Sequence, residues 1–188
     1  KAMLFLNKRV EEVKNGDKKE LIWILEHPKI FTAGVRFKQN EIIDQKIKII
    51  KTNRGGKITL HNSGQKIVYF VINLNERKKD IRKLINAIET SIIEFLNVLK
   101  IKSKKDKNNI GIWVKDKKIA AIGLRVSRWV AFHGFSINIS NNLKEYLKIV
   151  PCGLDNKKIT SVFSEKKIIP KNYENKLIKI FIKNINKI

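Results

Sequence analysis

One long amphipathic segment limits the folds that are open to this chain. Over residues 80–99 the apolar side chains recur every three or four positions, which predicts a helix with one apolar face and with Asp80 as its N-cap. That face consists of Ile81, Leu84, Ile85, Ile88, Ile92, Phe95, Leu96 and Leu99. Such a helix needs another layer of structure to cover its apolar face, so the rest of the chain has to provide that layer.

Apolar and β-branched runs predict that this layer is a sheet. Strands are expected over residues 21–26, 47–51, 67–74, 110–114, 118–126 and 130–139, with the fourth and fifth forming a hairpin. The first run is short and ends at His27-Pro28, so we expect a buried strand there. Further helices are expected over residues 5–13 and 171–188, and a surface loop over residues 102–109. The pattern predicts an α+β fold in which a mixed sheet carries flanking helices.

The length and the composition favour one domain in a reducing compartment. The 188 residues contain no internal repeat and no Pro-rich linker, so residues 1–188 are expected to form a single catalytic domain. The sequence starts at Lys1, and we expect the start of the domain to precede it. One cysteine excludes an internal disulfide, and no run approaches the roughly 18 apolar residues of a membrane span. These features predict a cytoplasmic protein that has no membrane partner.

The formal net charge of +24 raises the question of a polyanionic partner. The basic residues are mostly lysines, and they are scattered along the whole chain and not gathered into one stripe with interleaved aromatic residues. This spread is typical of a solvated surface, so nucleic acid is not expected as a partner. A field of this sign would nevertheless attract an acidic protein.

The single cysteine is a candidate nucleophile. Cys152 lies in the sequence Val150-Pro151-Cys152-Gly153-Leu154, where the proline fixes φ and the glycine lets another group approach the sulfur. A small buried apolar residue is an equally good interpretation of this local sequence. A free thiol has a pKa of about 8.5, so a nucleophilic cysteine needs a nearby base or cation.

Four side chains are candidates for activating the thiol. They are the imidazoles of His27, His61 and His133 and the amine of Lys118, which begins the apolar run 119–123. Burial favours the neutral form of an amine, which can then accept a proton. A lysine at the end of a hairpin more often points to water, and the residue type alone does not separate Lys118 from Lys117. One cysteine and three dispersed histidines have no metal-ligand spacing, so no metal is expected.

A glycine pair marks a candidate binding segment. In Arg54-Gly55-Gly56 the glycines permit a close backbone approach, and the guanidinium can hold a carboxylate or a phosphate. An ordinary turn between strands is the alternative. The chain has no GxxxxGK[ST] loop and no GxGxxG motif, so no nucleotide cofactor is expected.

These clusters occur in the order that characterises a known family. The relevant stretches are LIWILEHPKIFTAG (residues 21–34), RGGKITLH (54–61), GQKIVYFVINL (64–74), GIWVKDKKIAAIGLRVSRWVAFHGFSINI (111–139), IVPCGL (149–154) and ITSV (159–162). In these stretches the chain resembles the lipoyl(octanoyl) transferases. The combination of KIAAIG with a PCG that follows later is the most specific part of the resemblance.

The resemblance implies a domain related to the biotin and lipoate protein ligases, acting without a cofactor. The implied reaction takes an octanoyl group from acyl carrier protein onto a cysteine, and then onto a lysine of the lipoyl domains of 2-oxoacid dehydrogenases or of the glycine cleavage H protein. It implies Cys152 as the acyl-thioester nucleophile and Lys118 as the residue that promotes its ionisation. The implied acyl site is lined by Arg54, Gly55, Gly56, Lys57, Ile58, Thr59, Leu60, His61, Ala121, Ile122, Gly123, Gly134, Phe135 and Ser136.

The sequence departs from the family pattern at one turn. The family has His-Gly-Pro-Gly-Gln, whereas this chain has His61-Asn62-Ser63-Gly64-Gln65, and Leu60 replaces the usual tyrosine. Asn62 can adopt a positive φ and thereby keep the turn, whereas Ser63 lacks the rigidity of proline. The preference for acyl chain length is therefore open. The alternative functions are an ATP-dependent lipoate or biotin ligase, a basic nucleic-acid-binding protein and a decayed enzyme.

Overall fold

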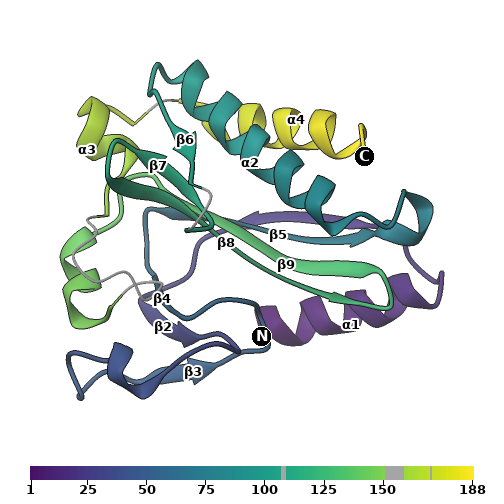
Figure 1. Cartoon of the computed structure of the whole chain (residues 1–188), viewed down its shortest axis with the longest axis horizontal. Helices are drawn as coiled ribbons and strands as arrows, with labels where there is room; N and C mark the ends of the chain where they lie inside the picture. The colour runs from purple at the N-terminus through teal and green to yellow at the C-terminus, as the bar shows by residue number, and fades with distance from the viewer. Residues whose placement is uncertain (107–108, 151–158, 170) are drawn as a thin grey trace.

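The computed structural model describes residues 1–106, 109–150, 159–169 and 171–188, so Cys152 lies outside the described residues. A six-stranded sheet has helices on both faces, and a smaller three-stranded sheet lies beside the N-terminal helix (Figure 1). The elements in chain order are α1 (Ala2–Lys14), β1 (Leu21–Leu25), β2 (Ile30–Ala33), η1 (Gln39–Glu41), β3 (Ile49–Lys51), β4 (Ile58–His61), β5 (Gln65–Asn73), η2 (Leu74–Glu76), α2 (Ile81–Val98), β6 (Lys104–Lys105), β7 (Ile112–Val114), β8 (Lys117–Ser127), β9 (Val130–Asn138), η3 (Leu143–Lys148), α3 (Val162–Lys166) and α4 (Tyr173–Ile185).

The large sheet is antiparallel throughout its described strands. Its order is β1-β5-β9-β8-β7-β6, with β5 and β9 paired over nine residues. The small sheet has the order β3-β2-β4, in which β2 runs parallel to β3 and antiparallel to β4. Among the named strands, the mixed pairing that the sequence predicted therefore occurs in the small sheet.

One face of the large sheet carries the main apolar core. Val68, Phe70 and Ile72 alternate along β5 and pack, with β9 residues, under α2 and α4. The predicted cap of α2 is confirmed, because the Asp80 carboxylate accepts a 3.0 Å hydrogen bond from the Lys83 backbone N–H. Its predicted apolar face is confirmed for most of its members, while Ile81 is exposed at the first turn.

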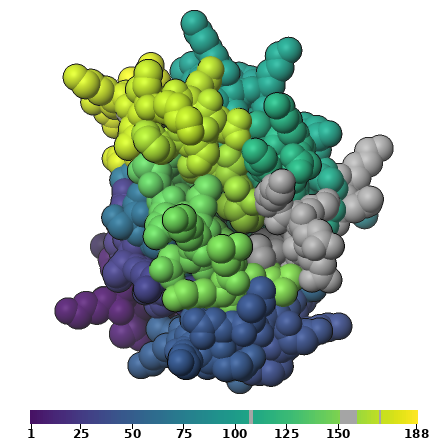
Figure 2. All heavy atoms as spheres, turned by 90° about the vertical axis from the view of Figure 1, so that its left-hand side faces the viewer, coloured from purple at the N-terminus to yellow at the C-terminus, as the bar shows by residue number. Residues whose placement is uncertain are grey.

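Two smaller cores lie on the opposite face. Leu6, Val10 and Val13 of α1 pack on β5 and β9. Phe31, Ile58 and Leu60 of the small sheet pack against Tyr146 and Ile149 at η3. Figure 2 shows these layers from the end of the molecule, with η3 in green between the blue segment around β2 and β3 and the yellow C-terminal helices.

The sequence prediction needs correction in several places. The strand over residues 21–26 was expected to be buried, but every residue of β1 is only half-buried because β1 is an edge strand. The expected loop over residues 102–109 contains the two-residue edge strand β6. The short elements β2, β4 and α3 were not predicted. The α+β fold class and the other predicted helices and strands are confirmed, with bounds shifted by a few residues.

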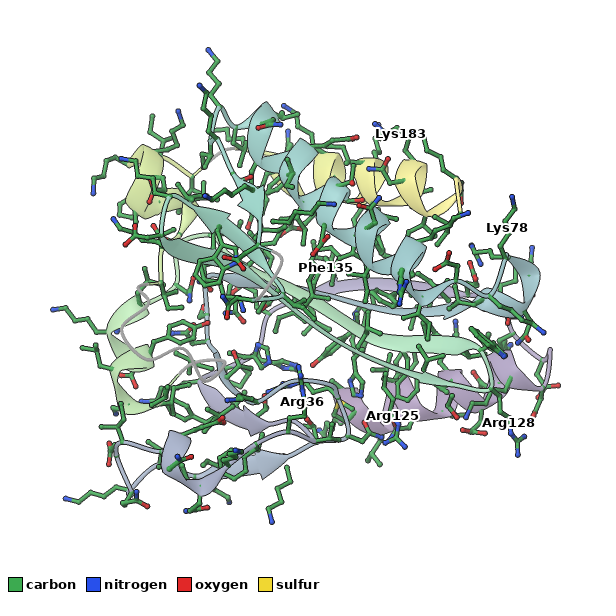
Figure 3. All side chains as sticks on the ribbon, in the orientation of Figure 1. Arg36, Lys78, Arg125, Arg128, Phe135 and Lys183 are labelled. Atoms are coloured by element: carbon green, nitrogen blue, oxygen red, sulfur yellow. The ribbon has the colours of Figure 1, made fainter. Side chains whose placement is uncertain are left out.

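Basic side chains extend from many sides of the molecule. Figure 3 shows exposed Lys78 and Arg128 at one end, Lys183 at the C-terminal helix and Arg36 near the small sheet, whereas Phe135 lies inside. The excess of positive charge is thus distributed over the surface, as the sequence predicted. Among the described residues, no helix is long and apolar enough to cross a membrane.

Candidate active site

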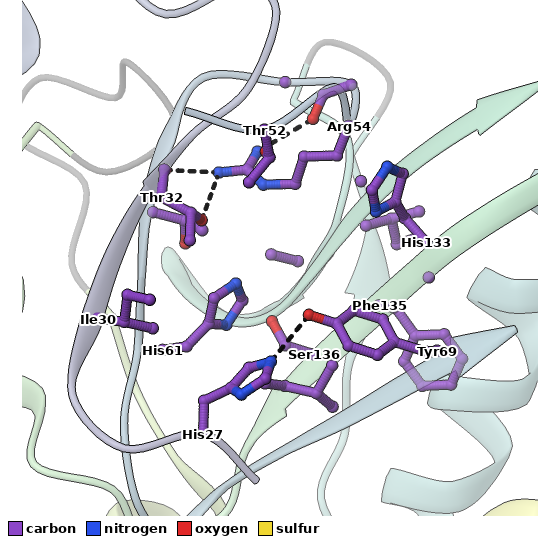
Figure 4. A pocket seen from close by; sticks show the side chains of 18 of the residues that line it. His27, Ile30, Thr32, Thr52, Arg54, His61, Tyr69, His133, Phe135 and Ser136 are labelled. Carbon is purple, nitrogen blue, oxygen red and sulfur yellow. Dashed lines mark hydrogen bonds between the residues drawn. The ribbon is translucent and has the colours of Figure 1, made fainter. Parts of the chain in front are cut away.

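A cavity of about 1030 Å³ lies between the two sheets. Its wall is formed by β2 and β4 of the small sheet, by β5, β8 and β9 of the large sheet, and by the segment that joins β3 to β4 (Figure 4). Most of the residues expected at the acyl site line this one cavity, and the expected catalytic residue Lys118 lines it as well. The acyl-site residues are Arg54, Gly55, Gly56, Lys57, Thr59, His61, Ala121, Ile122, Gly123, Gly134, Phe135 and Ser136.

Strand alternation divides the expected site residues of β4 into two groups. Thr59 and His61 line the cavity, whereas Ile58 and Leu60 are fully buried in the core of the small sheet. Successive side chains of a strand point to opposite faces, so these four residues cannot all reach the same cavity. Ile58 and Leu60 therefore support the cavity wall from behind.

Lys118 is a buried lysine on the cavity wall. Only 5% of its surface is exposed, while its neighbour Lys117 is half-buried and does not line the cavity. The Lys118 Nζ lies 5.5 Å from the centroid of the Trp113 ring, within the range of a cation–π contact. Gly111 lies against the Lys118 side chain, and a Cβ at Gly111 would clash with it. A hairpin-end lysine that points to water is thus excluded for Lys118.

Arg54 and Gly55 together connect the two sheets at the cavity. Its Nη2 donates to the Thr32 carbonyl at 2.7 Å and to Thr32 Oγ1 at 3.0 Å. The backbone N–H of Gly55 donates to the Leu124 carbonyl of β8 at 3.1 Å, and a Cβ at Gly55 would come within 2.8 Å of that same oxygen. Arg54 thus binds the small sheet while Gly55 lies directly on the large one, which explains why this position needs glycine.

All three histidines of the chain line this cavity. His27 Nε2 lies 2.9 Å from the Tyr69 hydroxyl, His61 Nδ1 lies 2.7 Å from Gln65 Oε1, and His133 Nε2 lies 2.6 Å from Asn53 Oδ1. The ring centroids of His27 and His61 are 6.0 Å apart. Their spacing in the sequence gave no sign of this convergence, because it is produced by strand pairing.

Burial makes these imidazoles weak bases. It lowers the pKa of His61 to about 4, helped by the positive charge of Arg54, although the hydrogen bond to Gln65 opposes the shift. Burial and the charges of Arg54 and Arg125 lower the pKa of His133 to about 4. Burial also lowers the pKa of His27. All three rings are therefore neutral at pH 7.

His133 reaches the cavity through an unusual backbone conformation. Ala131, Phe135 and Ile137 of β9 face the core under the helices, so strict alternation would place His133 there as well. Its φ of 72° interrupts that alternation, and its ring stacks on Phe132 at a centroid distance of 5.0 Å. A positive φ in a β-strand histidine is uncommon and is typical of functional sites.

The turn that departs from the family pattern has a different geometry from the one expected. Its positive φ of 83° belongs to Gly64, and Asn62 does not adopt one. Asn62 instead donates through Nδ2 to the Asn142 carbonyl at 2.9 Å and accepts from Asn141 Nδ2 at 3.0 Å. These contacts secure the turn to the segment before η3, because a buried amide with partners on both sides is costly to move.

Sequence reasoning missed several residues of this site. Gln65 was predicted only as the last residue of a turn, and Tyr69 only as a position within the strand over residues 67–74. A polar residue four positions after His61 and a tyrosine in an otherwise apolar run were the available signals. Within the described ranges, no group of three or more His, Cys, Asp or Glu residues could hold a metal ion.

A family model covers almost the whole chain. Residues 2–182 match the lipoyl protein ligase A/B catalytic domain. An octanoyltransferase of Ehrlichia chaffeensis is 43% identical over 86% of this chain and 78% of its own length. An octanoyltransferase of Rickettsia bellii is 39% identical over 96% of this chain and 92% of its own length.

Solved structures agree on the fold. A lipoate-protein ligase A bound with ATP superposes with a TM-score of 0.75 over 90% of this chain and 74% of that protein, at 14% identity. A biotin protein ligase of Aquifex aeolicus has a TM-score of 0.53 over 83% of this chain and 69% of its own, at 13% identity. At such low identity these likenesses establish the fold and leave the reaction to other arguments.

Proposed function

Because this chain belongs to the lipoyl protein ligase A/B catalytic domain family and to its octanoyltransferases, we propose that it carries an octanoyl group from acyl carrier protein to lipoyl domains through a thioester on Cys152. It is an acyltransferase of lipoate biosynthesis. The donor, the thioester and the site residues are the proposed parts. The observation that carries them is the buried Lys118 amine on the wall of a cavity of ligand-binding size.

The first half-reaction loads the enzyme. The Cys152 thiolate attacks the carbonyl carbon of the donor thioester, a carbon–sulfur bond forms to Cys152, and the bond to the donor sulfur breaks. The proton lost by Cys152 ends on the donor thiol. One thioester replaces another, so the step needs no nucleotide.

The second half-reaction transfers the acyl group. The amine of the acceptor lysine attacks the Cys152 thioester, a carbon–nitrogen bond forms and the carbon–sulfur bond breaks. The proton released by the amine ends on Cys152. Lys118 is the proposed residue that promotes ionisation of Cys152 in the first step and accepts the amine proton in the second.

The protein partners follow from the reaction. A solved archaeal lipoate protein ligase with a similar fold was analysed together with its E2 lipoyl domain. We propose the lipoyl domains of 2-oxoacid dehydrogenases and the glycine cleavage H protein as acceptors. A free catalytic thiol requires a reducing compartment, so we propose the cytoplasm as the location.

Mass spectrometry of the intact protein tests the thioester directly. Incubation with octanoyl-acyl carrier protein should add one octanoyl group to the wild type, and addition of a lipoyl domain should remove it. Cys152→Ser should add none while its far-UV circular dichroism is unchanged. Multiple turnover by Cys152→Ser at the wild-type rate would exclude the thioester mechanism.

An ATP-dependent ligase is the second candidate, and the fold it shares with the ATP-bound lipoate-protein ligase A favours it. Such an enzyme activates a free acid as an adenylate and needs no cysteine. The two reactions separate by substrate. We expect octanoylation of the lipoyl domain from octanoyl-acyl carrier protein without ATP, and none from octanoate plus ATP.

A further inference from the structure

The position of the proton on His61 can be deduced from a main-chain carbonyl. The Thr160 carbonyl can only accept, and it accepts a 3.0 Å hydrogen bond from Asn138, so that end of the amide is Nδ2. The other end, Asn138 Oδ1, must therefore be an acceptor. It lies 2.8 Å from the amide nitrogen of the fully buried Gln65.

The orientation of Gln65 follows. Its Nε2 lies 2.8 Å from Asn138 Oδ1, 2.9 Å from the Tyr146 hydroxyl and 3.3 Å from the Leu60 carbonyl, and its two hydrogens are shared among these acceptors. The Gln65 Oε1 is consequently the atom that lies 2.7 Å from His61 Nδ1. A carbonyl oxygen has no proton to give, so His61 Nδ1 carries the hydrogen.

The other ring nitrogen is then a bare acceptor. Burial, the first cause, and the charge of Arg54 hold the pKa of His61 near 4, so the ring is neutral at pH 7. A neutral imidazole has one N–H, and Nδ1 has it. His61 Nε2 therefore presents a lone pair on the part of the ring that Gln65 does not contact, and His61 is one of the residues that line the cavity (Figure 4).

We propose that His61 accepts a hydrogen bond through Nε2 from an N–H group of the substrate, and that Gln65 is the positioning residue that keeps this lone pair available. The identity of the substrates rests on the proposed function. An apolar acyl chain cannot satisfy such an acceptor, whereas an N–H can come from the amine of the acceptor lysine or from an amide of the donor.

The same network extends to the strand that carries Lys118. The Thr160 carbonyl accepts from Asn138, and the Thr160 backbone N–H donates to the Lys118 carbonyl at 2.9 Å. Lys118 also bridges to Ile159 in a parallel β-bridge. One chain of buried hydrogen bonds thus supports both the His61 ring and the backbone of Lys118, which relates the acceptor to the reacting side of the cavity.

Other charged groups near His61 determine how it responds to pH. The charge of Arg54 opposes its protonation, and His27 does so too once it is itself protonated in acid. Tyr69 of β5 and Tyr146 of η3 contribute hydroxyls whose partners are His27 and Gln65, and Ser136 of β9 has no charge. Glu26, Lys57 and Lys118 line the same cavity, and the first two are paired with Lys66 and Glu41. None of these side chains contacts His61 Nδ1 in the described residues, where the hydrogen-bond partner of Nδ1 is Gln65 Oε1.

Gln65→Glu tests the proposal, because a carboxylate at this place stabilises a protonated His61 and raises its pKa toward neutrality. The two half-reactions are measured separately from pH 5 to 8.5, as loading from octanoyl-acyl carrier protein and as transfer from loaded enzyme to a lipoyl domain. Asn184→Asp is the matched control, since it converts another buried amide between α2 and α4. We expect one half-reaction of Gln65→Glu to slow about tenfold relative to the control below pH 6, and to recover above pH 8.

The half-reaction that becomes acid-sensitive identifies which substrate provides the N–H group. An acid-sensitive transfer step assigns it to the acceptor lysine, and an acid-sensitive loading step assigns it to the donor. Equal pH profiles for Gln65→Glu and Asn184→Asp in both half-reactions overturn the proposal. A wild type that fails to load at all contradicts the proposed function instead, so the two failures are distinguishable.

Two measurements remain decisive where Gln65→Glu does not fold. Nitrogen-15 NMR of the wild-type imidazoles at pH 7 should find the proton of His61 on Nδ1, with His133 as an internal contrast because its Nε2 faces Asn53 Oδ1. His61→Gln, which retains an acceptor oxygen, should keep more activity than His61→Leu. A proton on His61 Nε2, or equal activity of these two variants, contradicts the proposal.

Discussion

The two faces of the six-stranded sheet differ in role, because helices cover one face and the other lines the cavity. On one face Phe70 and its alternate neighbours on β5 are fully buried under α2 and α4. On the other face Ile67 and Tyr69 of the same strand line the cavity together with Ser136 of β9. Because side chains alternate along a strand, adjacent residues serve stability and chemistry separately. The consequence of a substitution is thus decided by which face the residue occupies.

The largest expected effect is on the cavity face. Lys118→Ala should lower the alkylation rate of Cys152 near pH 7 by about 100-fold or more, because in the proposed mechanism Lys118 promotes the ionisation of this thiol. The variant should still fold, so urea unfolding should show a cooperative transition like that of the wild type. Reaction with a thiol reagent followed by mass spectrometry measures this rate without ambiguity, because the chain has one cysteine.

Lys117→Ala is the control for this prediction. Lys117 is the neighbour on β8, is half-buried and lies outside the cavity wall. We expect its alkylation rate to stay within about twofold of the wild type. Equal rates for the two variants would mean that the burial of Lys118 has no bearing on the thiol.

The opposite face should respond in stability alone. Phe70→Ala removes a ring that lies 5.8 Å from the Phe181 ring of α4, so the free energy of unfolding should fall by about 3–5 kcal/mol. Urea unfolding measures this loss, and the transfer rate per folded molecule should be unchanged. Phe70→Leu is the milder variant where the alanine protein does not fold. A reduced rate per folded molecule in either variant would contradict the division between the faces.

Sequence reasoning succeeded for one of these faces. The apolar periodicity of α2, the Asp80 cap and the β-branched runs of β5 and β9 are local patterns, and burial under the helices depends on them directly. The four-residue strands β2 and β4 were not predicted, because so short a segment has too few alternating residues to be distinguished from a loop. Each of the two is stabilised by pairing with the other.

The cavity face depends on contacts that no local pattern encodes. His61 pairs with Ile30 across the small sheet, and His133 pairs with Phe70 across the large one, so strand register brings the histidines together. Lys118 was separated from Lys117 through the family resemblance, and the structural reason is its place beside Gly111 and Trp113. The local environment of Cys152 stays a sequence prediction, because this residue lies outside the described residues.

Acid should lower the free energy of unfolding through the histidines of the cavity face. The pKa values of His61 and His133 are about 4 in the folded protein against an ordinary value of 6.5, so the unfolded chain binds more protons between these limits. The free energy of unfolding is therefore fully retained above pH 6.5 and falls as the pH drops toward 4, by up to about 3 kcal/mol per histidine.

Urea unfolding at pH 7 and pH 4.5 checks this expectation. His61→Gln should lose less stability than the wild type over that interval, since it removes one of the three histidines whose pKa burial lowers. Glu89 of α2 has a pKa that burial raises, so its contribution has the opposite sign and cannot produce the loss. Equal losses for His61→Gln and the wild type would show that this imidazole does not control acid stability.

The smallest expected effect lies outside both faces, in the lysines of the surface. Exposed basic residues occur on many sides of the molecule, whereas Lys118 is buried in the cavity wall. Screening at physiological ionic strength shortens the reach of exposed charges to about 8–10 Å. Loading of Cys152 from acyl carrier protein, an acidic partner in the proposed reaction, should thus slow several-fold as salt rises at low substrate, because steering is lost. Loading from a small octanoyl thioester should change little, since that donor has no acidic surface and senses the cavity face alone. Identical salt dependence for the two donors would mean that the lysine excess has no part in capturing the partner.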